Sequence, residues 1–360
     1  MRVLVVTGSS GGHIFPALSF VDALQNRGQD ALLVLPKSNF LDQSYLEGYK
    51  VRYICVSSIK LCPNFKNLIA LFNFFKGFLE GASIISQFRP DVVVGFGSIA
   101  SLPILLSGRM FKAKTMIHEQ NVIPGRANRF LAGSADKIAV SFDETRSYFK
   151  CRAEKIILSG NPLRKELVKI DKVKALNFFG LGEDKFTILV MGGSQGSHSL
   201  NLGFLKAISM LPDRSRLQVI HLSGAKEELY LKDNYKQIGV NARIFSFLKD
   251  MHYAYSACDL FISRAGAATI SEAIFFELPA LVVPYPFAYE HQLKNAAILE
   301  RQGCALIIKD AELQTDRLKL VLEDLLNNPE KIKLMRYNYN NIPKANAAEL
   351  LVKETLRLAS

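Results

Sequence analysis

Short runs of β-branched and leucine-rich residues alternate with amphipathic stretches along the whole sequence. Representative apolar runs are Arg2–Thr7, Asp91–Val94, Thr187–Met191 and Leu260–Ile262. The segments between such runs extend over about 10 to 20 residues and place apolar side chains at helical spacing. This alternation predicts an α/β protein in which crossover helices join parallel strands, and it excludes all-α and all-β folds.

The opening strand and loop are repeated in the middle of the chain. Residues 2–13 read Arg-Val-Leu-Val-Val-Thr-Gly-Ser-Ser-Gly-Gly-His, and residues 187–197 read Thr-Ile-Leu-Val-Met-Gly-Gly-Ser-Gln-Gly-Ser. Each segment is a strand that runs into a glycine loop and a helix, which is how a doubly wound domain begins. A chain of 360 residues has room for two domains. The turn-rich Ser159–Pro162 marks the boundary, so we expect one domain over residues 1–160 and a second over 161–342.

Composition narrows the class of protein and partner. Five widely spaced cysteines without a C-x-x-C pair fit a reducing cytoplasm, and they predict neither a disulfide framework nor a cysteine-rich zinc site. The net charge is +12, of which +8 lies in residues 1–160, and this favours an anionic ligand or an acidic lipid surface. No run of five like charges and no basic helix with interleaved aromatic residues occurs, which argues against a nucleic-acid-binding protein.

One segment of the first domain is unusually rich in phenylalanine. The longest uncharged run, Val92 to Gly108, is too short and too interrupted to span a membrane. In Asn64–Leu79, however, apolar residues cover more of the helix circumference than one core-facing stripe needs. We expect a peripheral membrane patch here, made of Phe72, Phe74, Phe75, Lys76 and Phe78. The alternative is a helix that is buried on two sides.

Three glycine-rich loops follow predicted strands, at Gly8–Gly12, Gly95–Ser98 and Gly192–Gly196. Glycine lets backbone N–H groups approach a phosphate closely, and the helix that follows presents its positive dipole end to the same anion. A single loop of this kind is equally well explained as a tight turn. Three of them at the carboxyl ends of strands favour a ligand with phosphate groups.

Several polar side chains near these loops are candidates for chemistry. His13 follows the first loop at a helix start, where a neutral imidazole can accept a proton, although a core or solvated histidine is the commoner case. His118–Asn121 are four consecutive polar residues at the end of a strand, which are costly to bury without a purpose. Glu272 lies about one and a half turns into a helix, where it could bind a ribose diol or simply complement the helix dipole.

Other chemistries remain open at this stage. Gly192–Gly196 also satisfies G-x-S-x-G, and Asp259 and His291 follow in the order that a hydrolase triad needs. Gly95-x-Gly97-x-x-Ala100 resembles a dinucleotide fingerprint, with Glu119 about 20 residues further on. The sequence contains no H-E-x-x-H, no G-x-x-x-x-G-K-[ST] and no D-x-D motif. A bound diphosphate would therefore be neutralised by helix ends and basic side chains.

The motifs together resemble those of the MurG family, the undecaprenyl-diphospho-muramoyl-pentapeptide N-acetylglucosaminyltransferases that make lipid II. The shared segments, in chain order, are Gly8–Pro16, His118–Asn121, Pro124-Gly125, Asn128-Arg129, Ser159–Arg164, Gly192–Gly196, Arg264–Glu272 and His291–Ala296. The resemblance spans nearly the whole chain. It implies a GT-B fold of two Rossmann-like doubly wound parallel-sheet domains facing a cleft, with the last helix (343–360) packed back on the first domain.

The resemblance also implies roles for individual residues. UDP-GlcNAc would contact Ser10, Gly11, Gly12, Asn121, Arg164, Ser194, Leu248, Ala267, Ala268, Thr269, Glu272, His291 and Gln292. The acceptor diphosphate would lie against Gly11, Gly12, Gly95, Gly97 and Ser98. His13 would take a proton from the acceptor hydroxyl, with His118 and Asn121 as orienting groups. Because Ser98 and Ile99 stand where the family has Gly-Tyr, no tyrosine role is carried over, and Ser9 and Ser10 also depart from its Gly-Gly-Thr-Gly-Gly-His loop.

The implied reaction is the inverting transfer of GlcNAc from UDP-GlcNAc to the C4 hydroxyl of undecaprenyl-diphospho-MurNAc-pentapeptide. It would need no obligatory metal and would take place at the cytoplasmic face of the inner membrane, with the protein bound peripherally. Two alternatives stay open, namely a related GT-B glycolipid glycosyltransferase with another acceptor and an α/β serine hydrolase.

Overall fold

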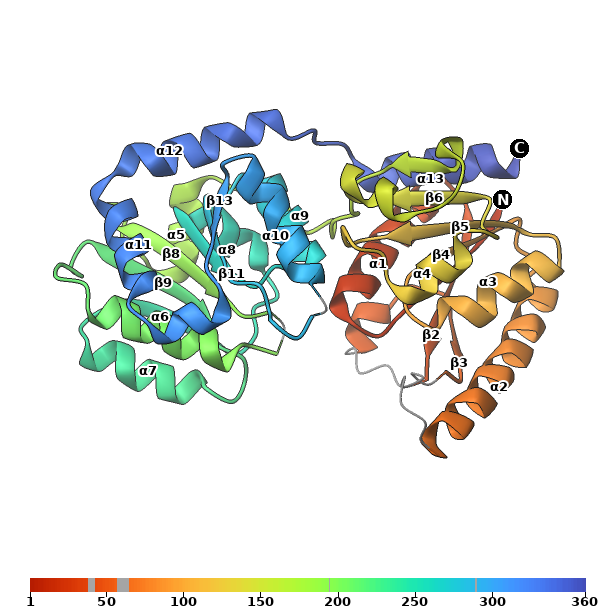
Figure 1. The fold of residues 1–360 in the computed structure, drawn as a ribbon, viewed down its shortest axis with the longest axis horizontal. Helices are drawn as coiled ribbons and strands as arrows, with labels where there is room; N and C mark the ends of the chain where they lie inside the picture. The colour runs from red at the N-terminus through yellow and green to blue at the C-terminus, as the bar shows by residue number, and fades with distance from the viewer. Residues whose placement is uncertain (38–42, 57–64, 194, 289) are drawn as a thin grey trace. The chain divides into compact units, whose positions relative to one another are not determined.

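The computed structural model describes residues 1–37, 43–56, 65–193, 195–288 and 290–360 (Figure 1). The chain divides into two compact units. The first consists of Met1–Arg164 and Ala345–Ser360, and the second of Lys165–Lys344. Each unit is built around one sheet in which all paired strands are parallel, so the expected pair of doubly wound α/β domains is confirmed.

The first unit contains a seven-stranded sheet in the order β3-β2-β1-β4-β5-β6-β7. Its strands are β1 (Arg2–Thr7), β2 (Asp30–Pro36), β3 (Val51–Ile54), β4 (Val92–Phe96), β5 (Lys114–Glu119), β6 (Lys137–Val140) and β7 (Ile156–Leu158). Its helices are α1 (Gly11–Asn26), α2 (Phe65–Phe88), α3 (Ser101–Met110), α4 (Arg126–Leu131) and α13 (Ala347–Ala359).

Both faces of this sheet are covered, which explains why its strands are almost continuously apolar. Along β1, Val3 and Val5 pack in the cluster that contains the buried residues of α1 and α13. Leu4 and Val6 point to the opposite face and pack in the cluster formed with α2, α3 and α4. Successive side chains of a strand alternate between faces, so one apolar run serves two cores.

The last helix belongs to the first unit, although 180 residues of the second unit precede it. Asn346 caps α13 by accepting a hydrogen bond from the backbone N–H of Glu349 at 3.2 Å. Leu351 and Val352 are fully buried in the same cluster as Phe20 of α1. Figure 1 shows α13 beside α1, where these side chains complete one face of the sheet.

The second unit contains a six-stranded sheet in the order β10-β9-β8-β11-β12-β13. Its strands are β8 (Phe186–Met191), β9 (Leu217–Leu222), β10 (Asn241–Phe245), β11 (Leu260–Ser263), β12 (Ala280–Val282) and β13 (Ala305–Ile307). Its helices are α5 (Lys172–Phe179), α6 (His198–Ser209), α7 (Glu228–Gln237), α8 (Met251–Ala257), α9 (Ala267–Phe276), α10 (His291–Arg301), α11 (Arg317–Asn327) and α12 (Pro329–Tyr337).

Strand order decides where each unit can hold a ligand. In the first sheet the order reverses between β1 and β4, and in the second between β8 and β11. At such a switch point the two loops that follow the central strands diverge to opposite faces and leave a crevice at the carboxyl edge. The four segments that follow these strands are Gly8–Gly12, Gly95–Ser98, Gly192–Gly196 and Arg264–Gly266.

None of the helices in the described part of the chain is both long and apolar enough to cross a membrane. This includes α2, which has 24 residues.

Ser98 has a left-handed backbone, with φ of 69° next to Gly97 at 72°. A side chain at such a φ costs roughly 1 kcal/mol, whereas glycine adopts this conformation freely. We therefore expect Ser98→Gly to raise the free energy of unfolding by about 0.5–1 kcal/mol in urea titrations. The matched control is Ser86→Gly in the exposed interior of α2, which should lower it by a similar amount. A destabilised Ser98→Gly protein would contradict the strain assigned to this loop.

Candidate functional site

In the first unit, two glycine loops meet at the carboxyl edge of the sheet. Thr7 pairs with Phe96 at the ends of β1 and β4, so the loops that follow lie next to each other. Ser9, Ser10 and Gly12 are exposed and Gly11 is half-buried at the start of α1. The first turn of α1 contains no acidic residue, and its leading amides have no intrahelical acceptor. This helix start is therefore electrostatically suited to an anion.

His13 is the first side chain of α1 to reach the neighbouring loop. A Cβ added to Gly97 would lie 3.0 Å from His13 Cε1 and 3.1 Å from His13 Nδ1, so only glycine allows the ring to pack this closely against the loop backbone. The half-buried imidazole has its Nδ1 3.0 Å from Gln120 Oε1. Sequence reasoning quoted Gln120 within a motif but gave it no role. Four adjacent polar residues after a strand were the available signal.

The polar segment that ends β5 is buried, with His118, Glu119 and Gln120 at most 2% exposed. His118 Nε2 lies 3.0 Å from the carbonyl oxygen of Gly160, and His118 Nδ1 lies 3.0 Å from Gln120 Nε2. Burial lowers the pKa of His118 to about 4, so the ring is neutral near pH 7. A ring this deeply buried acts through its neighbours.

Glu119 holds the loop that follows β5. One carboxylate oxygen accepts hydrogen bonds from the backbone N–H and side-chain amide of Asn121, at 2.9 and 3.3 Å. The other accepts from the backbone N–H of Gly125 and the side chain of Asn128, at 3.0 and 2.8 Å. These four donors occupy the carboxylate. Glu119 is therefore not the ribose-binding acid of a dinucleotide fingerprint, and that alternative is not supported.

Two further predicted residues lie in the first unit. Asn121 is half-buried at the head of the loop that Glu119 organises. The guanidinium of Arg164 lies 4.8 Å from the centre of the Phe15 ring on α1, in a cation–π contact, and its Nε atom is buried without a hydrogen-bond partner.

In the second unit, the loop after β8 approaches the loop after β9 closely. A Cβ added to Gly196 would lie 2.1 Å from the carbonyl oxygen of Ser223, so this position accepts only glycine. Neither α6 nor α9 has an acidic residue in its first turn. Both helices begin at the switch point with their positive dipole ends free of carboxylates. Ser194, predicted to face the diphosphate, lies outside the described residues.

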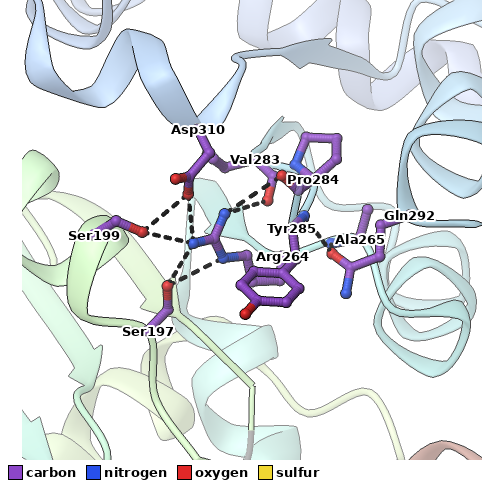
Figure 2. A network of polar contacts seen from close by, with 9 residues as sticks. All are labelled: Ser197, Ser199, Arg264, Ala265, Val283, Pro284, Tyr285, Gln292 and Asp310. Carbon is purple, nitrogen blue, oxygen red and sulfur yellow. Dashed lines mark hydrogen bonds and ion pairs between the residues drawn. The ribbon is translucent and has the colours of Figure 1, made fainter. Parts of the chain in front are cut away.

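Arg264, directly after β11, is the centre of a polar network in this unit (Figure 2). Its guanidinium donates to the hydroxyls of Ser197 and Ser199 at 2.7 and 2.8 Å, and to the carbonyl of Val283 at 3.1 Å. It also forms a 2.6 Å ion pair with Asp310. Arg264 is buried, and these partners satisfy the charge that burial would otherwise penalise. The network holds the start of α6 against the end of β12.

Sequence reasoning did not assign a function to Arg264 or Asp310. A guanidinium that follows an apolar strand inside a run of small residues was a usable signal for Arg264. Its partner Asp310 had none, because the pairing joins loops from two different strands.

Gln292 lies in the first turn of α10 and joins the same region (Figure 2). Its Oε1 accepts hydrogen bonds from the backbone N–H groups of Ala265 and Tyr285, at 3.1 and 2.8 Å. The carbonyl side of this amide therefore stabilises the loops, and its Nε2 is the end that can donate to a ligand. His291 is the first residue of the same helix and is half-buried.

The remaining predicted donor-side residues lie on α9 and just before α8. Ala267, Ala268 and Thr269 form the first turn of α9, where small side chains leave the backbone amides accessible. One turn further on, Glu272 Oε2 accepts a 2.6 Å hydrogen bond from the hydroxyl of the buried Tyr255 on α8. This bond restricts the orientation of the carboxylate. Leu248 is buried, so only its backbone can be offered to a ligand.

The structure contradicts the hydrolase alternative. Asp259 precedes β11 and binds the backbone N–H of Thr187, at the amino end of β8, at 2.9 Å. The Gly192–Gly196 loop lies at the carboxyl end of β8, six residues or roughly 20 Å away. A triad needs its acid within hydrogen-bond reach of the histidine that activates the serine. Asp259 is instead at the opposite edge of the sheet and also pairs with Lys172.

No group of three or more His, Cys, Asp or Glu side chains suited to a metal ion is present among the residues that the structure describes.

The expected membrane patch lies on α2 and is exposed on one side. The most exposed apolar side chains of the helix are Leu71, Phe72, Phe75 and Leu79, between 55% and 66% exposed. At 100° per residue these positions fall within a single arc of about 100°. Lys76 is exposed next to the arc, whereas Phe74 and Phe78 are half-buried. The exposures of Phe72 and Phe75 oppose the alternative of a helix buried on two sides.

The end of α3 lies beside the middle of α2, because the hydroxyl of Ser107 donates to the carbonyl of Phe78 at 3.3 Å. Immediately after Ser107, Met110 and Phe111 are 59% and 47% exposed. The basic residues Arg109, Lys112 and Lys114 are exposed in the same segment. Apolar and basic side chains therefore adjoin on this part of the first unit.

Comparison with known proteins identifies relatives of both units. The model of the glycosyltransferase family 28 N-terminal domain matches residues 3–140, and that of the family 28 C-terminal domain matches residues 187–353. A protein of Desulforamulus reducens is 35% identical over 98% of this chain and 97% of its own length, and one of Halothermothrix orenii is 33% identical over the same shares. Both are named UDP-N-acetylglucosamine–N-acetylmuramyl-(pentapeptide) pyrophosphoryl-undecaprenol N-acetylglucosamine transferase. The crystal structure of Acinetobacter baumannii MurG superposes with a TM-score of 0.79 at 23% identity, covering 99% of this chain and all of that one.

Two fully buried histidines make stability depend on pH. Burial lowers the pKa of His221 on β9 to about 3 and that of His118 to about 4, from 6.5. Below pH 6.5 the unfolded chain binds protons that the folded chain excludes, so the free energy of unfolding falls as the pH decreases. Each histidine contributes up to about 1.4 kcal/mol per pH unit between roughly pH 4 and 6.

We expect His221→Gln to make this pH dependence shallower by up to that amount, even if the variant is less stable at every pH. Urea unfolding followed by circular dichroism at several pH values between 4 and 7 measures the slope. Equal slopes for the variant and the parent protein would show that His221 is not buried as a neutral ring.

Proposed function

The chain belongs to glycosyltransferase family 28, and we propose from this membership that it transfers N-acetylglucosamine from UDP-GlcNAc to undecaprenyl-diphospho-MurNAc-pentapeptide. Its relatives carry the name of that reaction over nearly their whole length. The reaction converts lipid I to lipid II in peptidoglycan synthesis. We place the donor on the second unit and the lipid-linked acceptor on the first.

The observation that carries the proposal is the arrangement at the carboxyl edge of the second sheet. The starts of α6 and α9 follow the adjacent strands β8 and β11 and contain no acidic residue in their first turns. Main-chain amides at two such helix ends suit a diphosphate that gains negative charge as it leaves. Because Arg264 is paired with Asp310, its role here is to hold the α6 start in place.

The nucleotide and sugar are assigned to the residues around these helix starts. Glu272, oriented by the Tyr255 hydroxyl, accepts hydrogen bonds from the ribose hydroxyls. The backbone at Leu248 and the Arg164 guanidinium contact the nucleotide. His291 and the Nε2 donor of Gln292 bind sugar hydroxyls. Ser194 and the Ala267–Thr269 turn face the diphosphate.

The chemical step is a single displacement. The C4 hydroxyl oxygen of the muramoyl group forms a bond to C1 of GlcNAc while the bond from C1 to the UDP oxygen breaks, with inversion at C1. The hydroxyl proton passes to His13, with Asn121 and His118 as orienting groups. Amides at Gly11, Gly12, Gly95, Gly97 and Ser98 hold the acceptor diphosphate. No metal ion is required by this scheme, since helix ends and basic residues supply the positive charge.

Donor recognition is tested by titration calorimetry. We expect the protein to bind UDP-GlcNAc in preference to UDP-GalNAc and GDP-sugars. Glu272→Gln should weaken UDP-GlcNAc binding roughly 10- to 100-fold, which is the range expected for losing charge-assisted hydrogen bonds to a diol. The matched control is Glu300→Gln, an exposed position at the end of α10, which should bind like the parent.

Equal affinity for UDP- and GDP-sugars, or unchanged binding by Glu272→Gln, would contradict the donor assignment. Transfer assays with undecaprenyl-diphospho-MurNAc-pentapeptide and with a diacylglycerol acceptor then distinguish this reaction from that of a related glycolipid glycosyltransferase.

We propose in addition that α2 binds the surface of the membrane that carries the acceptor. The exposed arc with Phe72 and Phe75 enters the acyl boundary, with the half-buried Phe74 and Phe78 beneath it. Lys76 and the basic residues at the end of α3 meet anionic headgroups. The protein is then peripheral on the cytoplasmic face of the inner membrane.

Replacing Phe72 and Phe75 together by serine should lower partitioning to phosphatidylglycerol vesicles at least tenfold, because each ring loses roughly 1.5–3 kcal/mol of apolar burial. Turnover of a water-soluble acceptor analogue should stay unchanged. Phe130→Ser is the control, since Phe130 on α4 is 69% exposed but lies on another helix. Vesicle sedimentation measures binding, and equal partitioning of the double variant and the parent protein would remove the patch.

A further inference from the structure

A continuous chain of hydrogen bonds links the start of α1 to the end of the first unit's sheet. It runs from His13 Nδ1 to Gln120 Oε1 at 3.0 Å, from Gln120 Nε2 to His118 Nδ1 at 3.0 Å, and from His118 Nε2 to the Gly160 carbonyl oxygen at 3.0 Å. His118 and Gln120 are at most 1% exposed, so water does not compete for these contacts.

The direction of each bond follows from the carbonyl at the far end. A carbonyl oxygen only accepts, so His118 Nε2 must carry the hydrogen that is donated to Gly160. Burial keeps the His118 ring neutral, with a pKa of about 4. A neutral imidazole has one N–H, which leaves the Nδ1 of His118 as an acceptor.

The orientation of the Gln120 amide follows in turn. Its Nε2 faces two acceptors, His118 Nδ1 at 3.0 Å and the His118 carbonyl oxygen at 3.4 Å. An amide nitrogen donates and an amide oxygen accepts, so the nitrogen belongs on this side and Oε1 belongs on the side of His13. His13 Nδ1 must therefore be the protonated nitrogen, and the lone pair of the neutral ring is on Nε2.

We propose that Gln120 and His118 are positioning residues that hold neutral His13 in its Nδ1–H tautomer, so that Nε2 is the atom that takes the proton from the acceptor hydroxyl. This inference rests on the proposed function, because it names the proton-accepting atom of that reaction. Free histidine favours the opposite tautomer, with the hydrogen on Nε2, so the protein must impose this one.

Two features of the surroundings support this role. Gly97 packs against the ring at a distance that no other residue would allow, which fixes the ring plane while Gln120 fixes the proton. The nearby carboxylate of Glu119 is occupied by Asn121, Gly125 and Asn128, so the partner of His13 is a neutral amide. When Nε2 gains a proton, Nδ1–H still donates to Gln120, and no bond in the chain has to reverse.

The tautomer can be measured without catalysis, by nitrogen NMR of the full-length protein labelled with ¹⁵N-histidine, above the pH at which His13 titrates. His13→Gln identifies the His13 signals. We expect a protonated Nδ1 and an unprotonated Nε2 in the parent protein. Gln120→Leu should shift the population to the Nε2–H tautomer and lower kcat roughly tenfold or more, part of the 10²- to 10⁴-fold that a general base contributes. The KM for UDP-GlcNAc should remain within about twofold.

Gln120→Glu separates positioning from folding, because it retains an acceptor oxygen towards His13. It should keep the Nδ1–H tautomer, recover turnover relative to Gln120→Leu, and move the acid limb of the kcat profile to higher pH, since a carboxylate favours the protonated ring. Thr115→Val is the control for loss of a buried hydrogen bond elsewhere in the sheet, at Asp136, and should change neither tautomer nor kcat.

An Nε2–H tautomer in the parent protein would overturn the inference. So would an unchanged tautomer in Gln120→Leu, or an altered tautomer with unchanged kcat. Failure of the proposed function is a separate result, namely no transfer and no UDP-GlcNAc binding by a parent protein whose His13 carries its hydrogen on Nδ1.

Discussion

A parallel sheet sends the carboxyl ends of all its strands to one edge, and this constraint decides where chemistry can occur in both units. Reversal of strand order on either side of β1 and β4, and of β8 and β11, separates two loops at that edge. Helices that start there present unpaired amides, and apolar faces elsewhere are consumed by packing. The polar residues that need an explanation, from His13 to Arg264, are therefore found at the two switch points.

The two edges solve the problem of buried polarity in different ways. In the second unit a charged group, Arg264, is neutralised by Asp310 and by hydroxyl and carbonyl oxygens, which makes the α6 start rigid. In the first unit the chain through Gln120 and His118 is uncharged from end to end. A neutral chain suits a ring that must gain and lose a proton, whereas a paired charge suits a helix end that has to stay fixed while negative charge develops beside it.

The order of strands and helices could be predicted from the sequence because the apolar runs serve two faces and the intervening segments have helical periodicity. The glycine loops and the His118–Asn121 segment were also recognisable, since such residues are rarely buried after a strand without purpose. The roles of Gln120 and Asp310 were not, because each depends on a partner more than 40 residues away, or on which end of an amide faces it. Pattern alone also left two readings of α2, which only the exposure of Phe72 and Phe75 could separate.

The return of α13 to the first unit has a consequence for how the protein is made. Leu351 and Val352 fill the sheet face that also contains Val3 and Phe20, yet they leave the ribosome after all 180 residues of the second unit. At typical translation rates that delay is on the order of ten to forty seconds. During this interval one apolar face of the nascent first unit is uncovered, and it must be shielded by a chaperone or by transient contacts. The second unit can complete its own core before the first.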